Sequence, residues 1–211
     1  TKKRNMKAKK IALILIPINI ILIYFVYNSI NSEMVFNKEA TIRISNNVQK
    51  LKDLRQLQVK YKQNHGEFSD NFEKLEYFLN FEDIKIINII GETPDSLSES
   101  EALKAGIISA DTSYVSAKEN VFDKTYMKTR KNKFPLKIDD LTSVPYSKKK
   151  YEVDAGEIQK GNVTVQVFEI STNYQAVFNG LDASNKSYQL DELLKVGSMT
   201  EASLNGNWKT E

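Results

Sequence analysis

An apolar run near the N-terminus constrains the fold of this chain more than any other feature. Residues 11–30, IALILIPINIILIYFVYNSI, contain no Asp, Glu, Lys, Arg or His and follow the basic stretch TKKRNMKAKK. About twenty mainly apolar helical residues span the hydrocarbon core of a bilayer, and flanking lysines stay on the cytoplasmic side. We therefore predict a basic cytoplasmic tail over residues 1–10, a transmembrane helix over 11–30, and export of the residues that follow.

Two other structures can contain an apolar run at this position. A secretory signal peptide has an apolar region of about 7–15 residues and a small-residue cleavage site. This run is longer, and no A-x-A pattern follows it. A buried core helix is the other alternative, which the flanking lysines disfavour. The sequence therefore favours a retained membrane anchor.

Several residues within the predicted span indicate contacts at membrane depth. Pro17 removes a backbone donor and predicts a kink. An unsatisfied amide is unfavourable in lipid, so Asn19 predicts a hydrogen bond, either to a partner helix or to its own turn. Tyr24 and Tyr27 suit the far headgroup layer. We predict Pro17, Asn19 and Tyr24 as the membrane partner contacts.

Composition narrows the compartment and the chemistry. The chain has 211 residues, a formal net charge of +3 and no cysteine. Disulfides, thiolate catalysis and cysteine-based metal sites are thereby excluded, and the nearly balanced charge beyond the N-terminal tail gives no broad field for nucleic acid. Abundant Lys, Asn and Ile without Cys is typical of a bacterial envelope protein. These properties predict a single-pass inner-membrane protein with its C-terminal domain in the periplasm.

A helical pattern follows the predicted span. Apolar residues recur every three or four positions on one face from residue 37 to 64, whereas charged residues occupy the other faces. This segment has too few clean heptads for a coiled coil. We predict a membrane-proximal amphipathic helix over residues 31–66 that docks along a globular domain and ends at His65-Gly66. The apolar positions are Ala40, Ile44, Val48, Leu51, Leu54, Leu57 and Tyr61.

Residues 67–211 predict a periplasmic α+β domain with a mixed or antiparallel sheet. In its first half we expect a helix over 71–80 with Asp70 as N-cap, a buried strand over 84–90, and a short helix opened by a capping box of Ser98 and Glu101. Residues 107–121 predict extended pieces with Tyr114 and Val115 in the core. The basic stretch 124–135 predicts a loop or a boundary between two halves.

The second half of this domain has a β pattern. Residues 151–158 and 162–170 predict a hairpin with a turn that contains Gly161. Residues 174–178 predict a further strand, and residues 190–196 predict a short helix or strand. The predicted fold class is therefore α+β, with an N-terminal transmembrane helix that continues into the amphipathic helix.

The sequence contains no recognisable catalytic, cofactor or metal constellation. His65 is the only histidine, and its place before a glycine at a helix end is explained by the helix dipole. Phosphate-binding loops and the G-x-S-x-G elbow do not occur. The acidic pairs Glu99/Glu101 and Asp139/Asp140 are explained by helix capping and by a solvated turn. We therefore predict a protein that is not an enzyme and has no cofactor.

Two basic runs form a candidate docking patch for an acidic partner or anionic lipid. Solvated loops are the other interpretation of both runs. Aromatic residues, among them Tyr126 and Tyr146, lie close to them in the sequence. The basic residues of the candidate patch are Lys128, Arg130, Lys131, Lys133, Lys148, Lys149 and Lys150.

The segment LRQLQVKYKQNHGEF, residues 54–68, resembles the end of the first helix of type IV pilins and pseudopilins. Tyr61, Gly66 and Phe68 occupy the positions of the Tyr-x-x-x-x-Gly-x-[Tyr/Phe] turn in that family. The resemblance covers about sixty residues and implies a long helix that lies partly in the membrane and is partly docked on the head domain. The processing signal of that family has no counterpart here. No glycine precedes the apolar run, where a lysine stands directly before Ile11, and no glutamate lies five residues into the run.

The whole chain is similar to uncharacterised single-pass envelope proteins of Bacteroidota. The similarity depends on the anchor, residues 54–68, PLKIDDLTSVPYS (135–147) and VGSMTEASLNGNW (196–208), and it implies a folded domain throughout the exported segment. We expect a non-enzymatic component of an envelope assembly that contacts the lipid bilayer and other membrane or periplasmic proteins. A homo-oligomer is compatible with the sequence. A pilin-like filament subunit, and a ligand receptor or carboxylate-based enzyme, are the alternatives.

Overall fold

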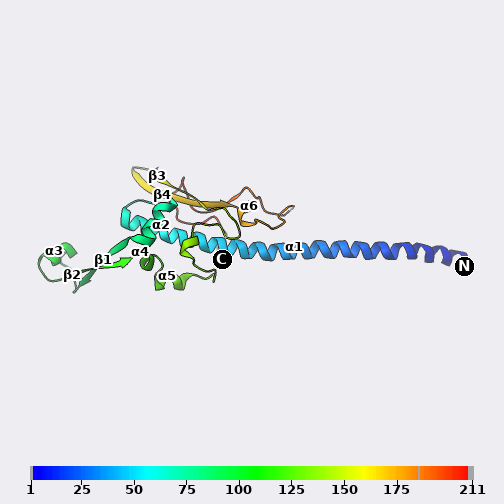
Figure 1. The fold of residues 1–211 in the computed structure, drawn as a ribbon, viewed down its shortest axis with the longest axis horizontal. Helices are drawn as coiled ribbons and strands as arrows, with labels where there is room; N and C mark the ends of the chain where they lie inside the picture. The colour runs from blue at the N-terminus through cyan, green and yellow to red at the C-terminus, as the bar shows by residue number, and fades with distance from the viewer. Residues whose placement is uncertain (1, 185, 209–211) are drawn as a thin grey trace.

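The computed structural model describes residues 2–184 and 186–208, and their side chains from residue 13 onward. The side chains of the predicted cytoplasmic tail, residues 1–10, therefore lie outside the described part. The chain is α+β, with one long N-terminal helix and two antiparallel sheets (Figure 1). This architecture confirms the predicted α+β class and the long apolar N-terminal helix.

Helix α1 (Lys2–His65) is the axis of the molecule. Its 64 residues continue through Pro17 without interruption, and at about 1.5 Å per residue they extend about 96 Å. The large apolar residues of its first half, from Leu13 to Val35, are exposed. Its second half runs through the folded head, which lies at one end of the molecule (Figure 1). The helix ends at Gly66, whose φ is +84 degrees, and this left-handed conformation stops a helix.

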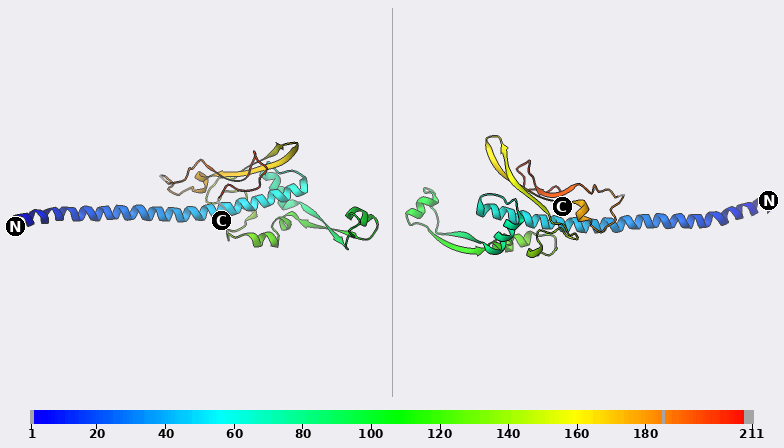
Figure 2. Two further views of the ribbon diagram at one scale, coloured as in Figure 1. Left: turned by 180° about the vertical axis from the view of Figure 1, so that it is seen from behind. Right: turned by 45° about the horizontal axis from the view of Figure 1, so that its top comes forward.

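The second half of α1 is buried on several faces. The predicted apolar stripe is in the core, where Ala40, Leu51 and Leu54 have no exposed surface. The charged residues Lys50 and Asp53, which were expected on solvent-facing sides, are 3 % and 1 % exposed. The sheet lies along one side of α1, whereas α4 and α5 lie along the other (Figures 1 and 2). A helix enclosed from two sides buries more than one stripe, which is why the single-stripe prediction was incomplete.

The larger sheet has the order β3–β4–β5 and is antiparallel throughout. Strands β3 (Glu152–Lys160) and β4 (Val163–Asn173) form the predicted hairpin, and β5 (Leu193–Gly197) pairs with the end of β4. The expected strand at 174–178 was wrong. Helix α6 (Tyr174–Val177) occupies this place, because the Asn173 side chain accepts a hydrogen bond from the Ala176 N–H and caps a helical turn.

A two-stranded ribbon projects from the head beyond the end of α1 (Figure 2). It follows α2 (Phe72–Phe81) and consists of β1 (Asp83–Ile90) and β2 (Ser109–Ser116), with α3 (Glu99–Lys104) at its tip. The capping box of Ser98 and Glu101 is confirmed, whereas the N-cap of α2 is Asn71 and not Asp70. The strand predicted at 84–90 is confirmed as β1, but its predicted burial was wrong, because β1 pairs with β2 alone and its apolar residues are largely exposed.

The ribbon returns to α1 through α4 (Ala117–Val121) and α5 (Lys124–Thr129). A 3-10 turn (Ile138–Asp140) then leads to β3. Tyr114, expected in the core, is 67 % exposed, whereas Ala117 and Val121 are buried. One hydrophobic cluster joins α1, α2, α4, α6, β4 and β5. The head therefore has a single core with α1 at its centre.

Candidate functional site

The described part of the chain has one helix that is long and apolar enough to cross a membrane. The apolar part of this helix near the N-terminus has no buried residue. The Asn19 side-chain amide donates to the Leu15 carbonyl at 2.9 Å. Of the two hydrogen bonds predicted for Asn19, this is the one within its own helical turn. Tyr24 is 64 % exposed on the same segment. These side chains, with that of Pro17, are available to lipid or to a partner helix.

The two basic runs approach the same turn of α1. Asn132 Nδ2 donates to Asn46 Oδ1 at 3.0 Å, and Asn46 Nδ2 donates to the Tyr146 hydroxyl at 2.7 Å. The loop after α5 and the loop before β3 are therefore held at Asn46 from two directions. Lysines of both runs stay exposed around this contact; they are Lys128, Lys131, Lys133, Lys148, Lys149 and Lys150.

Arg130 does not belong to that exposed basic surface. Its Nε and Nη2 donate to the two carboxylate oxygens of Asp53, each at 3.0 Å, and its side chain is 8 % exposed. Its prediction as a docking residue was wrong, because the buried Asp53 requires a charged partner.

Asp53 is the centre of a buried polar cluster. Its Oδ1 also accepts from the Tyr126 hydroxyl at 2.7 Å and from Gln49 Nε2 at 3.0 Å. Burial, and then the negative charge of Asp53, raise the pKa of Tyr126 far above its usual value. The phenol therefore stays protonated and donates to the carboxylate. Four hydrogen bonds converge on the Asp53 carboxylate, and this cluster fixes α5 and the following loop against α1.

Lys50 lies one turn before Asp53 and is also buried. Its Nζ donates to the Ser143 carbonyl and lies 3.4 Å from Asp140 Oδ2. Burial lowers the pKa of Lys50, an effect that the Asp140 carboxylate partly offsets. Both buried charges of α1 thus hold loops of the head in place. Neither pairing has a local signal in the sequence, since the partners lie 77 and 90 residues away along the chain.

The ribbon presents an exposed apolar face. Directly paired residues of antiparallel strands lie on one face, and the pairs Lys85–Tyr114 and Ile87–Thr112 place Ile87, Ile89 and Tyr114 together. These three side chains are 57 %, 41 % and 67 % exposed. We call them the ribbon face. Exposed large apolar residues gathered on a projecting element are typical of a protein interaction site.

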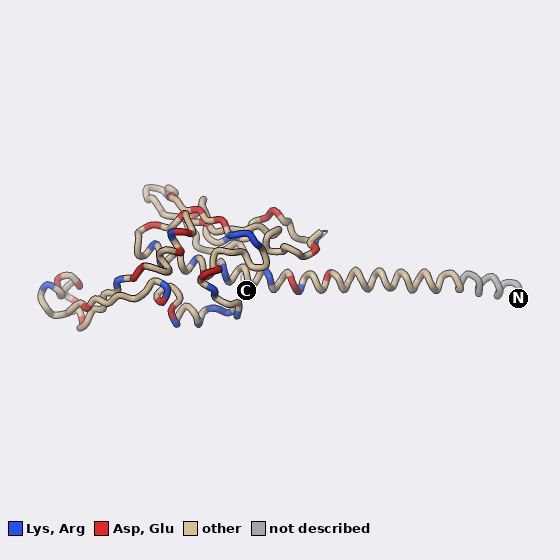
Figure 3. The backbone as a smooth tube through the Cα atoms, viewed as in Figure 1, with Lys and Arg blue, Asp and Glu red and all other residues tan. Residues whose placement is uncertain are grey.

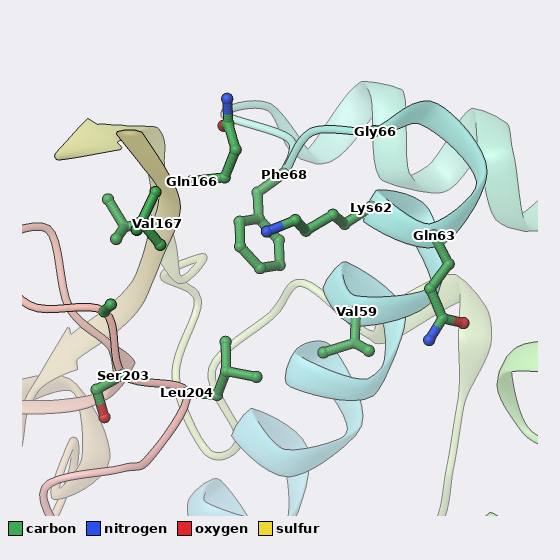
Figure 4. Close-up of a pocket in the computed structure, with 11 residues that line it drawn as sticks. Val59, Lys62, Gln63, Gly66, Phe68, Gln166, Val167, Ser203 and Leu204 are labelled. Carbon is green, nitrogen blue, oxygen red and sulfur yellow. The ribbon is translucent and has the colours of Figure 1, made fainter. Parts of the chain in front are cut away.

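A groove lies at the far end of the head, beside the last turns of α1. It has a volume of about 530 Å³ and is formed by α1, β4 and the segment 202–204. Figure 4 shows the side chains of Val59, Phe68, Val167 and Leu204 around a common space. We call it the edge groove; its lining residues are Val59, Lys62, Gln63, Gly66, Phe68, Val165, Gln166, Val167, Ala202, Ser203 and Leu204.

Lys62 gives the edge groove its electrostatic character. It is the only charged residue among those that line the groove within the described chain. Its Nζ lies 4.4 Å from the centre of the Phe68 ring, and no described carboxylate pairs with it. Figure 4 shows the Lys62 side chain extended across that ring. The groove therefore offers apolar walls and one positive charge.

The described residues hold no group of three or more His, Asp or Glu that could bind a metal ion. His65 stacks on Tyr61 and its Nε2 lies 3.2 Å from Glu82 Oε2, so it joins α1 to the end of α2. Acidic residues along the chain are dispersed over the head, as the red segments in Figure 3 show.

No family model, curated protein or solved structure matches this chain.

Proposed function

We propose that this protein is a membrane-anchored, non-enzymatic component of a multiprotein assembly in a bacterial envelope, and that it acts by protein–protein contacts. In this proposal residues 11–30 cross the inner membrane once. The basic N-terminus lies in the cytoplasm, and the head lies in the periplasm. Partner proteins meet the span and the head.

The continuity of α1 is the observation that carries this proposal. The same uninterrupted helix supplies the exposed apolar segment and the centre of the head's core, and Phe36 is already buried shortly after the proposed span. Phe36 packs edge-to-face on Phe178, with ring centroids 5.6 Å apart. A head built around the anchor helix cannot swing on a flexible linker. It holds its surfaces at a fixed height above the bilayer, as a spacer or adaptor requires.

The ribbon face supports a partner on the far side of the head. Helix α1 continues beyond the proposed span to His65. Residues 31–65 correspond to about 52 Å of helix, since each residue rises about 1.5 Å. The ribbon extends beyond that point (Figure 2). Ile87, Ile89 and Tyr114 are thus presented far from the bilayer surface, where only a protein with a large extramembrane part can meet them.

The experiment compares complexes of full-length protein extracted from its own membranes in mild detergent. A variant with Ile87→Lys, Ile89→Lys and Tyr114→Lys is expected to lose the partner that the native protein retains through purification. Asn88→Lys with Ser113→Lys is the matched control, since both residues lie on the opposite face of the same ribbon. Native protein that elutes as a lone monomer, or equal complex yields for the two variants, would contradict the proposal.

A pilin-like filament subunit is the second candidate. Its support is the geometry of the turn after α1, where Tyr61 and Phe68 are both 7 % exposed and Gly66 has a positive φ. Mass spectrometry of the mature N-terminus separates the two candidates. A mature chain that retains the lysine-rich residues 2–10 excludes conventional pilin processing.

A further inference from the structure

The groove beside α1 runs along an edge of β4 that no strand of the described chain covers. The hairpin loop consists of Gly161 and Asn162, since Lys160 pairs with Val163. The pair that flanks a two-residue loop exchanges both main-chain hydrogen bonds, and such pairs alternate along the ladder. Val163, Val165 and Val167 therefore direct their main-chain groups toward β3.

The intervening residues direct their main-chain groups the other way. Strand β5 covers that side of β4 only from Glu169 to Asn173. A Cβ on Gly197 would lie 2.2 Å from the Phe168 carbonyl oxygen, so this carbonyl points toward the β5 side, as the alternation requires. Thr164 and Gln166 point their N–H and C=O to the same side, where the described chain provides no strand.

The sheet position next to Thr164 and Gln166 coincides with the edge groove. Gln166 belongs to the groove lining, and residues 202–204 form the opposite wall. Unpaired strand edges bind extended segments through main-chain hydrogen bonds, while pockets select their side chains. Val59, Phe68 and Leu204 provide apolar contact area, and Lys62 provides a site for a carboxylate.

We propose that the edge groove binds an extended segment of a partner protein, which adds to β4 as a strand beside Thr164 and Gln166. The segment carries apolar side chains at alternate positions and an Asp or Glu that pairs with Lys62. Bilayer lipid does not fit as the occupant, because Lys62 lies about 48 Å along the helix from the end of the proposed span at residue 30. This inference rests on the proposed membrane anchor, but the site is separate from the ribbon face, so either site can fail its test without the other.

The test uses full-length protein in lipid nanodiscs and a phage-displayed library of short random peptides. Enriched peptides are expected to alternate apolar residues and to contain an acid. Gln166→Pro, which removes one outward N–H and no main-chain bond to β3, is expected to weaken binding of the best peptide about tenfold. Gln166→Ala removes the same side chain, with its bond to Glu157, and keeps that N–H, so the proposal requires Gln166→Pro to weaken binding more than Gln166→Ala does.

Two further measurements keep the result independent of the folding of the proline variant. Hydrogen exchange of the native protein is expected to show new protection at the amides of Thr164 and Gln166 when the peptide binds. Lys62→Gln is expected to weaken binding of the acidic peptide severalfold, whereas Lys118→Gln at an exposed position of α4 is not.

Three results would overturn the proposal. The first is a peptide that binds without protection of the Thr164 and Gln166 amides. The second is a peptide methylated at its backbone nitrogens that binds as well as the parent, since this would make the groove a side-chain pocket only. The third is self-association of the protein through this edge without peptide, since this would identify a second copy as the occupant.

Discussion

Arg130 and Asp53 form a buried, two-pronged ion pair between a loop of the head and the long helix α1. The Arg130 Nη2 and Asp53 Oδ2 atoms are 3.0 Å apart, and their side chains are 8 % and 1 % exposed. The pair joins residues 77 positions apart in the sequence. It therefore fixes the loop after α5, with its exposed lysines, to a defined turn of α1.

Replacement of Arg130 tests how much this ion pair contributes to the free energy of unfolding. Arg130→Met leaves Asp53 charged and buried, which is expected to lower the free energy of unfolding by about 3–5 kcal/mol. Lys131→Gln, at an exposed neighbouring position, is expected to change it by about 0.5 kcal/mol or less. Urea unfolding of the full chain in detergent measures both. Equal effects of the two substitutions would show that the pair does not hold the loop.

The stability of the folded chain at alkaline pH depends on the buried Tyr151. Burial raises the pKa of Tyr151 well above the usual tyrosine value of about 10. Its hydroxyl donates to Asn47 Oδ1 at 2.7 Å. The unfolded chain therefore loses this proton first. The contribution of this group to stability is constant below about pH 10 and falls as the pH rises above that value.

Tyr151→Phe is accordingly expected to make the decline above about pH 10 shallower. It also lowers stability at neutral pH by about 1–3 kcal/mol, because Asn47 loses a buried donor. Tyr77, which is 60 % exposed, gives the control substitution Tyr77→Phe. The measurement is the free energy of unfolding from about pH 8 to about pH 11. A slope equal to that of the native chain would contradict the assignment.

Two glycines with the same φ allow the cost of backbone strain to be measured separately from the cost of a steric clash. Gly180 and Gly197 both have a φ of +79 degrees. A Cβ at Gly180 meets nothing within 4 Å, whereas one at Gly197 would lie 2.2 Å from the Phe168 carbonyl oxygen. Gly180→Ala is expected to cost about 1 kcal/mol and Gly197→Ala about 2–4 kcal/mol. Thermal unfolding of both variants measures the difference, and equal losses would show that β5 does not pack on β4 at this point.

Asn19 tests the role of the proposed span in assembly. Asn19→Leu removes the amide and keeps the apolar length of the helix. If the Asn19 amide bonds to a partner helix in the membrane, the loss corresponds to about 0.6 kcal/mol, or about threefold weaker association. Cross-linking yield in native membranes measures the association, with Ile20→Leu as the control. Unchanged yield would leave the hydrogen bond to Leu15 as the whole role of this side chain.

Local patterns were sufficient to predict much of the fold. The apolar run and the stripe that follows it predicted a long helix, and α1 extends through both. Ser98 and Glu101 predicted their capping box, and alternating residues around Gly161 predicted the β3–β4 hairpin. Each of these signals lies within a few residues of the structure that it specifies, because capping, helical periodicity and tight turns depend on neighbouring residues.

The tertiary structure decided which of those elements are buried and which polar residues are paired. The segment 84–90 has the composition of a core strand, yet it lies in a projecting ribbon because no layer covers it. Asp53 and Arg130 are charged residues of the kind usually found at the surface, yet the head encloses both side chains. The open edge at Thr164 and Gln166 likewise exists only because β5 ends at Gly197. Burial and edge exposure depend on contacts between distant segments, so these features follow from assembly of the whole chain and not from local sequence.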